Sequence, residues 1–222
     1  MFIFLSFLAC ADNSVNDNAR DGAEESDISL NVGSSPRDWR PRNTVELDCP
    51  WISQQPTEDA STLNCGPTSL VMAAACVNQT IPTYDDVIDT ITWMDENVET
   101  YDGSGEDNNG SSTNTVELEE VGNEYFDIPS ERFYHILTLQ SLNEDLESGV
   151  PVLVAVDAQG DNATDVMEGG GGHFVLLVGM TPTHVIVHDP GPYSASLGEG
   201  HEYTIDSFLD TWQNAGVRFF VE

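Results

Sequence analysis

A cysteine at the start of a predicted helix is the residue of this chain best suited to nucleophilic chemistry. Cys65 stands just ahead of residues 66–78, an apolar segment rich in small residues that predicts a helix with Pro67 near its first position. The first N–H groups of a helix have no intrahelical partner and the macrodipole is positive there, so a thiol at this place has a lowered pKa and reacts as the thiolate. The alternative is a small buried cysteine on a core helix. Two features elsewhere in the chain favour the nucleophile.

The first feature is a predicted β-hairpin that brings a histidine and an aspartate together. Residues 173–179 and 184–189 are apolar runs with β-branched members, separated by a turn. With the turn centred between them, His173 lies opposite residue 189 or 190 and next to Asp189, to within one residue of register. An imidazole oriented by a carboxylate is the base half of a catalytic triad. His188 is one residue out of phase with Asp189 and is expected to face away.

The second feature is a glutamine shortly before Cys65. Residues 51–54 look like a short strand that ends in a loop leading to the helix, with Gln54 as its last member. A side-chain amide there can point at the same space as the backbone N–H of Cys65, and two donors aimed at one point make an oxyanion hole. Gln55 is the alternative donor.

In this order and spacing, these motifs resemble the papain-like cysteine peptidases, and specifically the peptidase C39-like family. The resemblance runs from about residue 47 to the C-terminus. The segments that carry it are 51–54, 64–69, 149–152, 172–179, 188–190, 203–209 and Trp212.

The resemblance implies a fold and a role for each site residue. The fold is α+β: an N-terminal helical lobe, whose nucleophile helix packs on a C-terminal antiparallel β-sheet. The family's roles carry over to Cys65 as nucleophile, His173 as base, Asp189 as orienter and Gln54 as oxyanion donor. The chain departs from the family in the glycine run 169–172, which makes the loop before His173 flexible and predicts a movable lip over the cleft.

The remaining pattern predicts helices first and strands later, the order that indicates an α+β fold. Further helices are expected at residues 84–93, 113–122, 141–148 and 206–214, and further strands at 150–156 and 217–221. The helix from residue 141 has the capping-box spacing of Ser141 and Glu144, and Gly149 ends it.

The charge of the chain excludes one class of partner. The formal net charge is −33, and the six basic residues are all arginine. Such a surface repels nucleic acid and anionic membranes, so no nucleic-acid partner is expected. It keeps a protein soluble where salt screens charge, as in a marine or halophilic source or outside the cell. A solvated acidic surface without a specific partner is the simplest interpretation.

The N-terminal sequence predicts export. Residues 1–10 are almost wholly apolar up to Cys10, too short to span a bilayer but typical of the apolar part of a secretion signal. The segment resembles the end of a lipoprotein signal, in which Cys10 is lipidated after cleavage. Residues 11–46 are polar and acidic and predict a disordered tether, with the peptidase-like domain at 47–222. The alternative is an ordinary mature N-terminal tail.

Two cysteines remain for a structural role. Cys49 precedes the Gln54 segment and Cys76 ends the helix that begins at Cys65. In an oxidising compartment they can form a disulfide that clamps this helix, and the alternative is two buried free thiols.

No cofactor or metal is expected, with a solvated acidic loop at 102–110 as the main interpretation and a looser cation site there as the alternative. The acidic loop 102–110 invites a calcium interpretation, but the EF-hand pattern needs Gly at position six and Glu at position twelve. This chain has Asp107 and Thr113 at those positions.

The sequence therefore predicts an exported, monomeric cysteine peptidase at the cell surface or outside the cell, acting on an amide bond of a peptide or protein through an acyl-enzyme. An acyltransferase or amidase on the same scaffold is one rival, because the acyl-enzyme chemistry is shared. A surface binding module without turnover is the other. The reactivity of Cys65 separates the second rival from the enzymes, since a binding module has no need of a low-pKa thiol.

Overall fold

The computed structural model describes residues 36–55, 64–101, 113–157, 172–192 and 194–221 of the 222-residue chain. They belong to one compact unit, Ser34–Glu222. The expectations for the signal-like segment with Cys10, the acidic loop 102–110 and the glycines at 169–171 fall outside the described residues.

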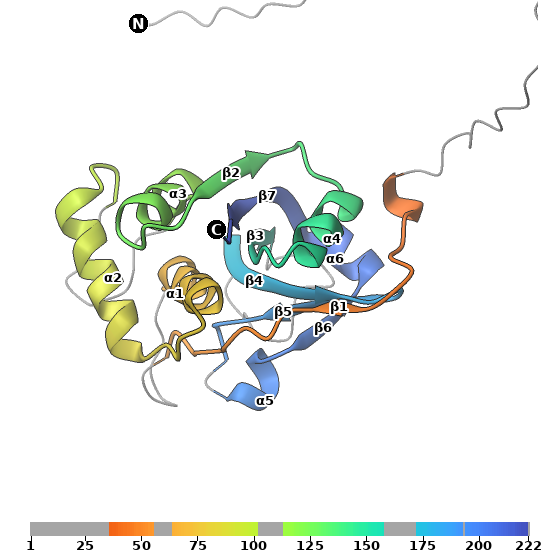
Figure 1. The fold of residues 1–222 in the computed structure, drawn as a ribbon, viewed down its shortest axis with the longest axis horizontal. Helices are drawn as coiled ribbons and strands as arrows, with labels where there is room; N and C mark the ends of the chain where they lie inside the picture. The colour runs from red at the N-terminus through yellow and green to blue at the C-terminus, as the bar shows by residue number, and fades with distance from the viewer. Residues whose placement is uncertain (1–35, 56–63, 102–112, 158–171, 193, 222) are drawn as a thin grey trace, which may run out of the picture. The chain divides into compact units, whose positions relative to one another are not determined.

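Helices dominate the first half of the described chain and strands the second, which confirms the α+β class (Figure 1). The helical elements are η1 (Pro36–Asp38), α1 (Cys65–Asn78), α2 (Tyr84–Asn97), α3 (Thr115–Glu124), α4 (Leu139–Glu147), α5 (Ala195–Gly198) and α6 (Ile205–Thr211). The strands are β1 (Val45–Glu46), β2 (Ser130–Tyr134), β3 (Val152–Asp157), β4 (Gly172–Met180), β5 (His184–His188), β6 (His201–Thr204) and β7 (Trp212–Phe219).

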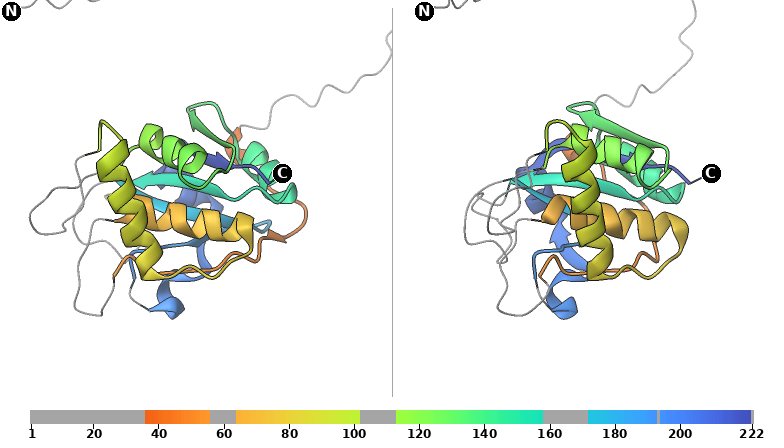
Figure 2. Two further views of the ribbon diagram at one scale, coloured as in Figure 1. Left: turned by 60° about the vertical axis from the view of Figure 1, so that its left-hand side comes forward. Right: turned by 90° about the vertical axis from the view of Figure 1, so that its left-hand side faces the viewer.

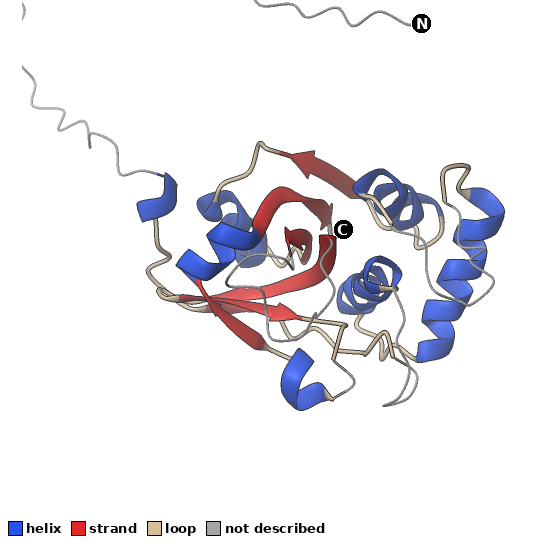
Figure 3. Cartoon of the chain, turned by 180° about the vertical axis from the view of Figure 1, so that it is seen from behind, coloured by secondary structure: helices blue, strands red, loops and turns tan. Residues whose placement is uncertain are grey.

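The strands form one antiparallel sheet of seven members. Its order is β2-β7-β3-β4-β5-β6, and β1 also pairs with β4. Figure 1 shows the sheet strongly curled, with α1, α2 and α3 to one side of β4 and with α4 and α6 to the other. Figure 3 shows the same curl from behind.

The central strand β4 separates two hydrophobic cores. Side chains alternate between the two faces of a strand. Phe174, Leu176 and Val178 enter the core that contains α1. Val175 and Leu177 enter the other core, with α4 and α6.

Helix α1 is enclosed by the sheet on one side and by α2 and α3 on the other (Figure 2). Ten consecutive residues, 66–75, are buried, which means that the helix is covered all round. The three alanines at 73–75 let the neighbouring elements approach the helix closely.

Capping residues explain where the flanking helices begin. Thr83 and Asp86 form a capping box at α2, and Asn114 and Glu117 form another at α3. The helix predicted at 141–148 is present as α4, but its predicted cap was wrong. The cap is Thr138, whose side chain accepts a hydrogen bond from the backbone N–H of Ser141, so the helix begins two residues earlier than expected.

Gly149 follows α4 with a φ of +81°, as expected for the residue after a helix end. Helix α2 extends four residues beyond the predicted end, to Asn97. The helix predicted at 206–214 is present as α6, but its predicted end was wrong, because α6 ends at Thr211 and β7 begins at Trp212.

The predicted boundary of the N-terminal tether was also wrong. Residues 36–46 belong to the folded unit, because β1 pairs with β4 and two arginines bind α6. Arg37 pairs with Asp210 at 3.0 Å and Arg40 with Asp206 at 2.7 Å. Local polarity indicated a tether, but β1 is made by pairing with a distant strand, in which Val45 meets Met180 and Glu46 meets Gly179.

The structure contains a disulfide between Cys49 and Cys76, whose Cα atoms are 4.5 Å apart. It ties the segment before Trp51 to the last turn of α1. Among the helices that the structure describes, none combines the length and the apolar character needed to cross a bilayer.

Candidate active site

Cys65 is the first residue of α1 and the one free cysteine in the described part of the chain. It is partly buried. The next residue must be small, because a Cβ added to Gly66 would lie 2.8 Å from the Cβ of Thr113. The first turn of α1 contains no acidic residue, so nothing in that turn opposes a thiolate at the positive end of the helix dipole.

His173 and Asp189 form a buried pair. The Nε2 atom of His173 lies 2.8 Å from Oδ1 of Asp189, and both side chains are 1% exposed. The same Oδ1 accepts a hydrogen bond from the backbone N–H of Gly191 at 2.8 Å. The carboxylate is therefore held in place by two donors, and it holds the ring of His173 through one of its two nitrogens.

Electrostatic interactions join Cys65 to this pair. Burial lowers the pKa of His173, but the hydrogen bonds and charges of Asp189 and Cys65 outweigh burial and raise that pKa to about 10. Burial raises the pKa of Cys65, but the hydrogen bond and charge of His173, with backbone hydrogen bonds at Phe174 and Gly66, leave it lowered. The two shifts have opposite signs, which favours a thiolate beside an imidazolium over a neutral thiol beside a neutral imidazole.

A bulge in β4 decides which way Asp189 faces. The pairs on either side of the irregularity are Gly179 with Ile186 and Leu177 with Val187. Val178 is therefore an extra residue in β4.

Beyond the bulge, His188 pairs with Leu176, so continuing this register sets Asp189 opposite Val175. Val175 and His173 share a face of β4, so Asp189 is the diagonal neighbour of His173. Continued to His173, this register sets it opposite residue 191, one position beyond the predicted 189 or 190 and within the one-residue tolerance of that prediction. Without the bulge, Asp189 would fall opposite Leu176 and point to the other face of the sheet.

Gln54 lies in a loop, and the strand predicted for residues 51–54 is not formed. The side chain is 3% exposed, and the backbone N–H donates to the carbonyl of Pro190 at 2.8 Å. The side-chain amide of Gln55 donates a hydrogen bond to the carbonyl of Gly191 at 2.7 Å. The donor considered as an alternative to Gln54 is therefore bound to the turn after β5.

His188 is a structural histidine. The backbone N–H of Gly200 donates to its Nδ1 at 3.0 Å, so Nε2 carries the proton and donates to the carbonyl of Cys49 at 2.8 Å. Its partner Leu176 faces the α1 core, so His188 and Asp189 point to opposite sides of the sheet.

One residue near the site was given no role from the sequence. The buried hydroxyl of Ser69 donates to the carbonyl of Phe174 at 3.1 Å, which ties the first turns of α1 to β4 beside His173. Its position four residues after Cys65 places both on one face of the helix, and that spacing is the signal in the sequence.

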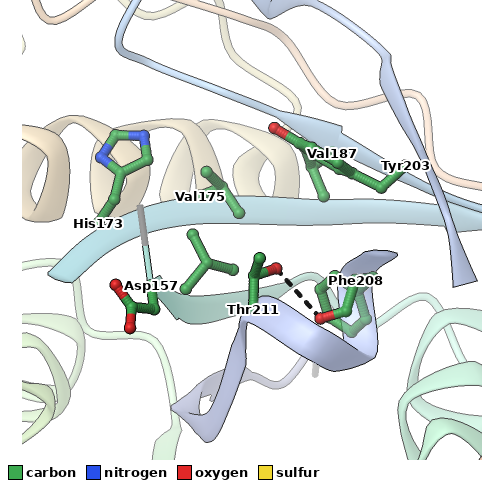
Figure 4. A pocket seen from close by; sticks show the side chains of 8 residues that line it. Asp157, His173, Val175, Val187, Tyr203, Phe208 and Thr211 are labelled. Carbon is green, nitrogen blue, oxygen red and sulfur yellow. Dashed lines mark hydrogen bonds between the residues drawn. The ribbon is translucent and has the colours of Figure 1, made fainter. Parts of the chain in front are cut away.

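A small, mostly apolar pocket adjoins His173 (Figure 4). Figure 4 shows His173 and Asp157 toward one end of the pocket, and Thr211 and Phe208 of α6 along its side. The hydroxyl of Thr211 donates to the carbonyl of Phe208 at 3.2 Å. In the described part of the chain, no three His, Cys, Asp or Glu side chains gather as a metal site would require.

The chain is a cysteine peptidase of α+β fold, and a family model carries this assignment. The chain belongs to the Peptidase_C39 like family, whose model matches residues 46–218. The match confirms the family predicted from the motifs. Curated proteins offer no match to this sequence.

One solved structure agrees with the fold. A protein from Bacillus anthracis assigned as a C39-like peptidase is similar with a TM-score of 0.58 at 18% identity, over 81% of this chain and 98% of that one. Two others resemble the chain more distantly. A double glycine motif protease from an AMS/PCAT transporter, solved with the leader peptide, has a TM-score of 0.46 at 14% identity, over 80% and 96%. Xylellain, a cysteine protease from Xylella fastidiosa, has a TM-score of 0.45 at 12% sequence identity, over 86% of this chain and 90% of that one.

Proposed function

We propose that this chain hydrolyses an amide bond of a peptide or protein through an acyl-enzyme on Cys65. His173 is the base and acid, Asp189 orients it, and Gln54 with the backbone N–H of Cys65 binds the oxyanion. The observation that carries the proposal is the buried His173–Asp189 pair at 2.8 Å, together with the opposite pKa shifts of His173 and Cys65.

In the first half of the reaction, the Cys65 thiolate attacks the carbonyl carbon and the carbonyl oxygen takes the negative charge. The imidazolium of His173 then gives its proton to the amide nitrogen, the C–N bond breaks and the amine leaves. The product is a thioester on Cys65 and a neutral His173. Asp189 keeps the ring oriented throughout, because its carboxylate is itself fixed by Gly191.

In the second half, a water molecule attacks the thioester carbon while His173 removes its proton. The C–S bond breaks, the carboxylic acid leaves, and the thiolate–imidazolium pair is restored. Removing one donor aimed at the oxyanion typically lowers kcat by a factor of about 10²–10³. The Gln54→Ala variant is therefore expected to lose kcat by a factor in that range.

The experiment is turnover of a fluorogenic peptide library by the wild type, Cys65→Ala and Cys65→Ser, at low and high salt. Mass spectrometry of the wild type mixed with substrate looks for an acyl group on Cys65. Turnover that survives in Cys65→Ala would exclude the mechanism.

The same experiment separates the rivals. An acyltransferase transfers the acyl group to an added amine in preference to water, so the acylated amine exceeds the acid. A binding module leaves Cys65 slow to alkylate and shows no turnover with any library member.

We also propose export, with lipidation of Cys10 and a monomeric domain outside the cell or at its surface. Support comes from the apolar residues 1–10 and from the Cys49–Cys76 disulfide, a bond that persists in oxidising compartments. Incorporation of a labelled fatty acid into the wild type but not into Cys10→Ser, with recovery in the membrane fraction, tests the anchor. Sedimentation of a soluble form tests the monomer.

A further inference from the structure

Asp189 is held by its backbone as well as by its side chain. Its N–H donates to the carbonyl of Gly198 at 2.8 Å. Its carbonyl accepts a hydrogen bond from the indole Nε1 of Trp51 at 2.7 Å. Because the side chain meets His173 and Gly191, any movement of this backbone moves the carboxylate that orients the imidazole.

Gly198 packs directly against the indole of Trp51 and the carbonyl of Asp189. A Cβ added there would lie 2.4 Å from the carbonyl oxygen of Asp189, 2.7 Å from Nε1 of Trp51 and 2.8 Å from its Cζ2. Real Cβ atoms do not approach so closely, so the indole can reach Asp189 only because residue 198 has no side chain. Trp51, Gly198 and Asp189 therefore pack as one unit.

Trp51 also begins a segment that follows the turn after β5 residue by residue. The carbonyl of Asp189 accepts from Trp51, that of Pro190 from the backbone of Gln54, and that of Gly191 from the side chain of Gln55. Three consecutive carbonyls thus meet one strap, residues 51–55. The strap carries the proposed oxyanion donor, so it sets Gln54 and Asp189 relative to each other.

We propose that Trp51 is a positioning residue for the reaction: its indole N–H, packed against Gly198, holds Asp189 so that the carboxylate stabilises the imidazolium of His173. The proposal rests on the triad proposed above. Trp51 does not touch the reacting atoms and acts through Asp189.

The test uses Trp51→Phe, which keeps an aromatic ring but removes the N–H. Two readouts are measured: the pH midpoint for alkylation of Cys65 by iodoacetamide, followed on the Cys65 peptide by mass spectrometry, and kcat and KM on the fluorogenic peptide pool. A less stable imidazolium makes the thiolate less stable. The midpoint is expected to rise by about one pH unit and kcat to fall about tenfold, the factor that one hydrogen bond is worth. KM should not change.

Trp93→Phe is the matched control. Trp93 lies on α2 and packs against Tyr125, with ring centroids 5.4 Å apart. This aromatic contact does not involve Asp189. The Trp93→Phe variant should keep the wild-type midpoint and kcat, so that a general effect of losing a tryptophan is separated from the loss of the Trp51 hydrogen bond.

Gly198→Ala is the second variant, because it keeps the indole and displaces it. It should show the same shift, and the double variant should lose no more than the worse single, since both act on one contact. If Trp51→Phe does not fold, the alkylation midpoint and kcat are measured on Gly198→Ala instead.

The outcomes are distinct. If Cys65→Ala is inactive and the folded Trp51→Phe or Gly198→Ala protein keeps the wild-type midpoint and kcat, the positioning role is wrong and the triad stands. If Cys65→Ala keeps turnover, the triad fails and the role of Trp51 fails with it.

Discussion

Replacing Asp189 by asparagine separates the charge of the orienter from its shape. The amide oxygen can still accept from Nε2 of His173 and from the N–H of Gly191, because both bind the same Oδ1 in the wild type. The negative charge is lost. The net rise of the His173 pKa from 6.5 to about 10 corresponds to roughly 5 kcal/mol, which is what remains of the favourable interactions with Asp189 and Cys65 after burial has opposed them.

The sign of the effect follows from the ion pair. The active form exists above the pKa of Cys65 and below that of His173. Without the carboxylate charge the pKa of His173 falls, by about 1–2 units for an opposite charge at this distance. The imidazolium then supports the thiolate less, so the pKa of Cys65 rises. The bell-shaped pH profile of kcat/KM should narrow from both sides, with its alkaline limb moving from near 10 to roughly 8–9.

Asp189→Asn should also lower stability. Oδ2 of Asp189 is buried and makes no hydrogen bond with the described residues. The NH₂ group of asparagine would take this place as a buried donor without an acceptor, at a cost of about 1–3 kcal/mol. Asp189→Ala also removes the hydrogen bond to His173, so burial lowers the pKa of His173 without an opposing interaction from residue 189. The kcat of Asp189→Ala at neutral pH should therefore fall further than that of Asp189→Asn.

The assays are kcat/KM from pH 4 to roughly 11 and the pH dependence of Cys65 alkylation, a range that brackets the ordinary pKa values of both groups. Asp206→Asn is the matched control, since Asp206 is 81% exposed and pairs with Arg40 on the surface. An alkaline limb of Asp189→Asn at the wild-type pH would refute the reasoning, because it would mean that the carboxylate charge does not set the pKa of His173.

Three further predictions concern the nucleophile, the disulfide and the surface charge. Iodoacetamide should label Cys65 stoichiometrically at neutral pH and faster than a free thiol; slow labelling that rises only near pH 8.5 would contradict the thiolate. Removing the disulfide with Cys49→Ala/Cys76→Ala should lower the free energy of unfolding by about 2–4 kcal/mol in chemical denaturation, with an unchanged wild-type value arguing against a stabilising bridge. Melting temperature should rise with sodium chloride, most steeply at low salt, and equally in Cys65→Ala; a flat curve would mean that the acids of the fold repel little.

Local sequence was sufficient to predict the nucleophile helix and the class of the fold. Cys65, Pro67 and the run of small apolar residues define the start and the burial of α1 through contacts within one segment. The ends of the other helices were less certain, because competing caps such as Thr138 and Ser141 differ only in which backbone N–H their hydroxyl meets.

Tertiary pairing decided what the local pattern left open. Residues 45–46 form a strand because β4 offers them a partner, and residues 51–55 form none because their hydrogen bonds go to the turn at 189–191.

The sequence by itself determined that a histidine and an aspartate would be neighbours near a reactive cysteine, because a hairpin follows from two apolar runs and a turn. The face on which His173 and Asp189 meet was decided by the tertiary structure alone. One extra residue, Val178, shifts the pairing of β4 with β5 by one position, and a shift of one position turns every side chain beyond it to the other face of the sheet.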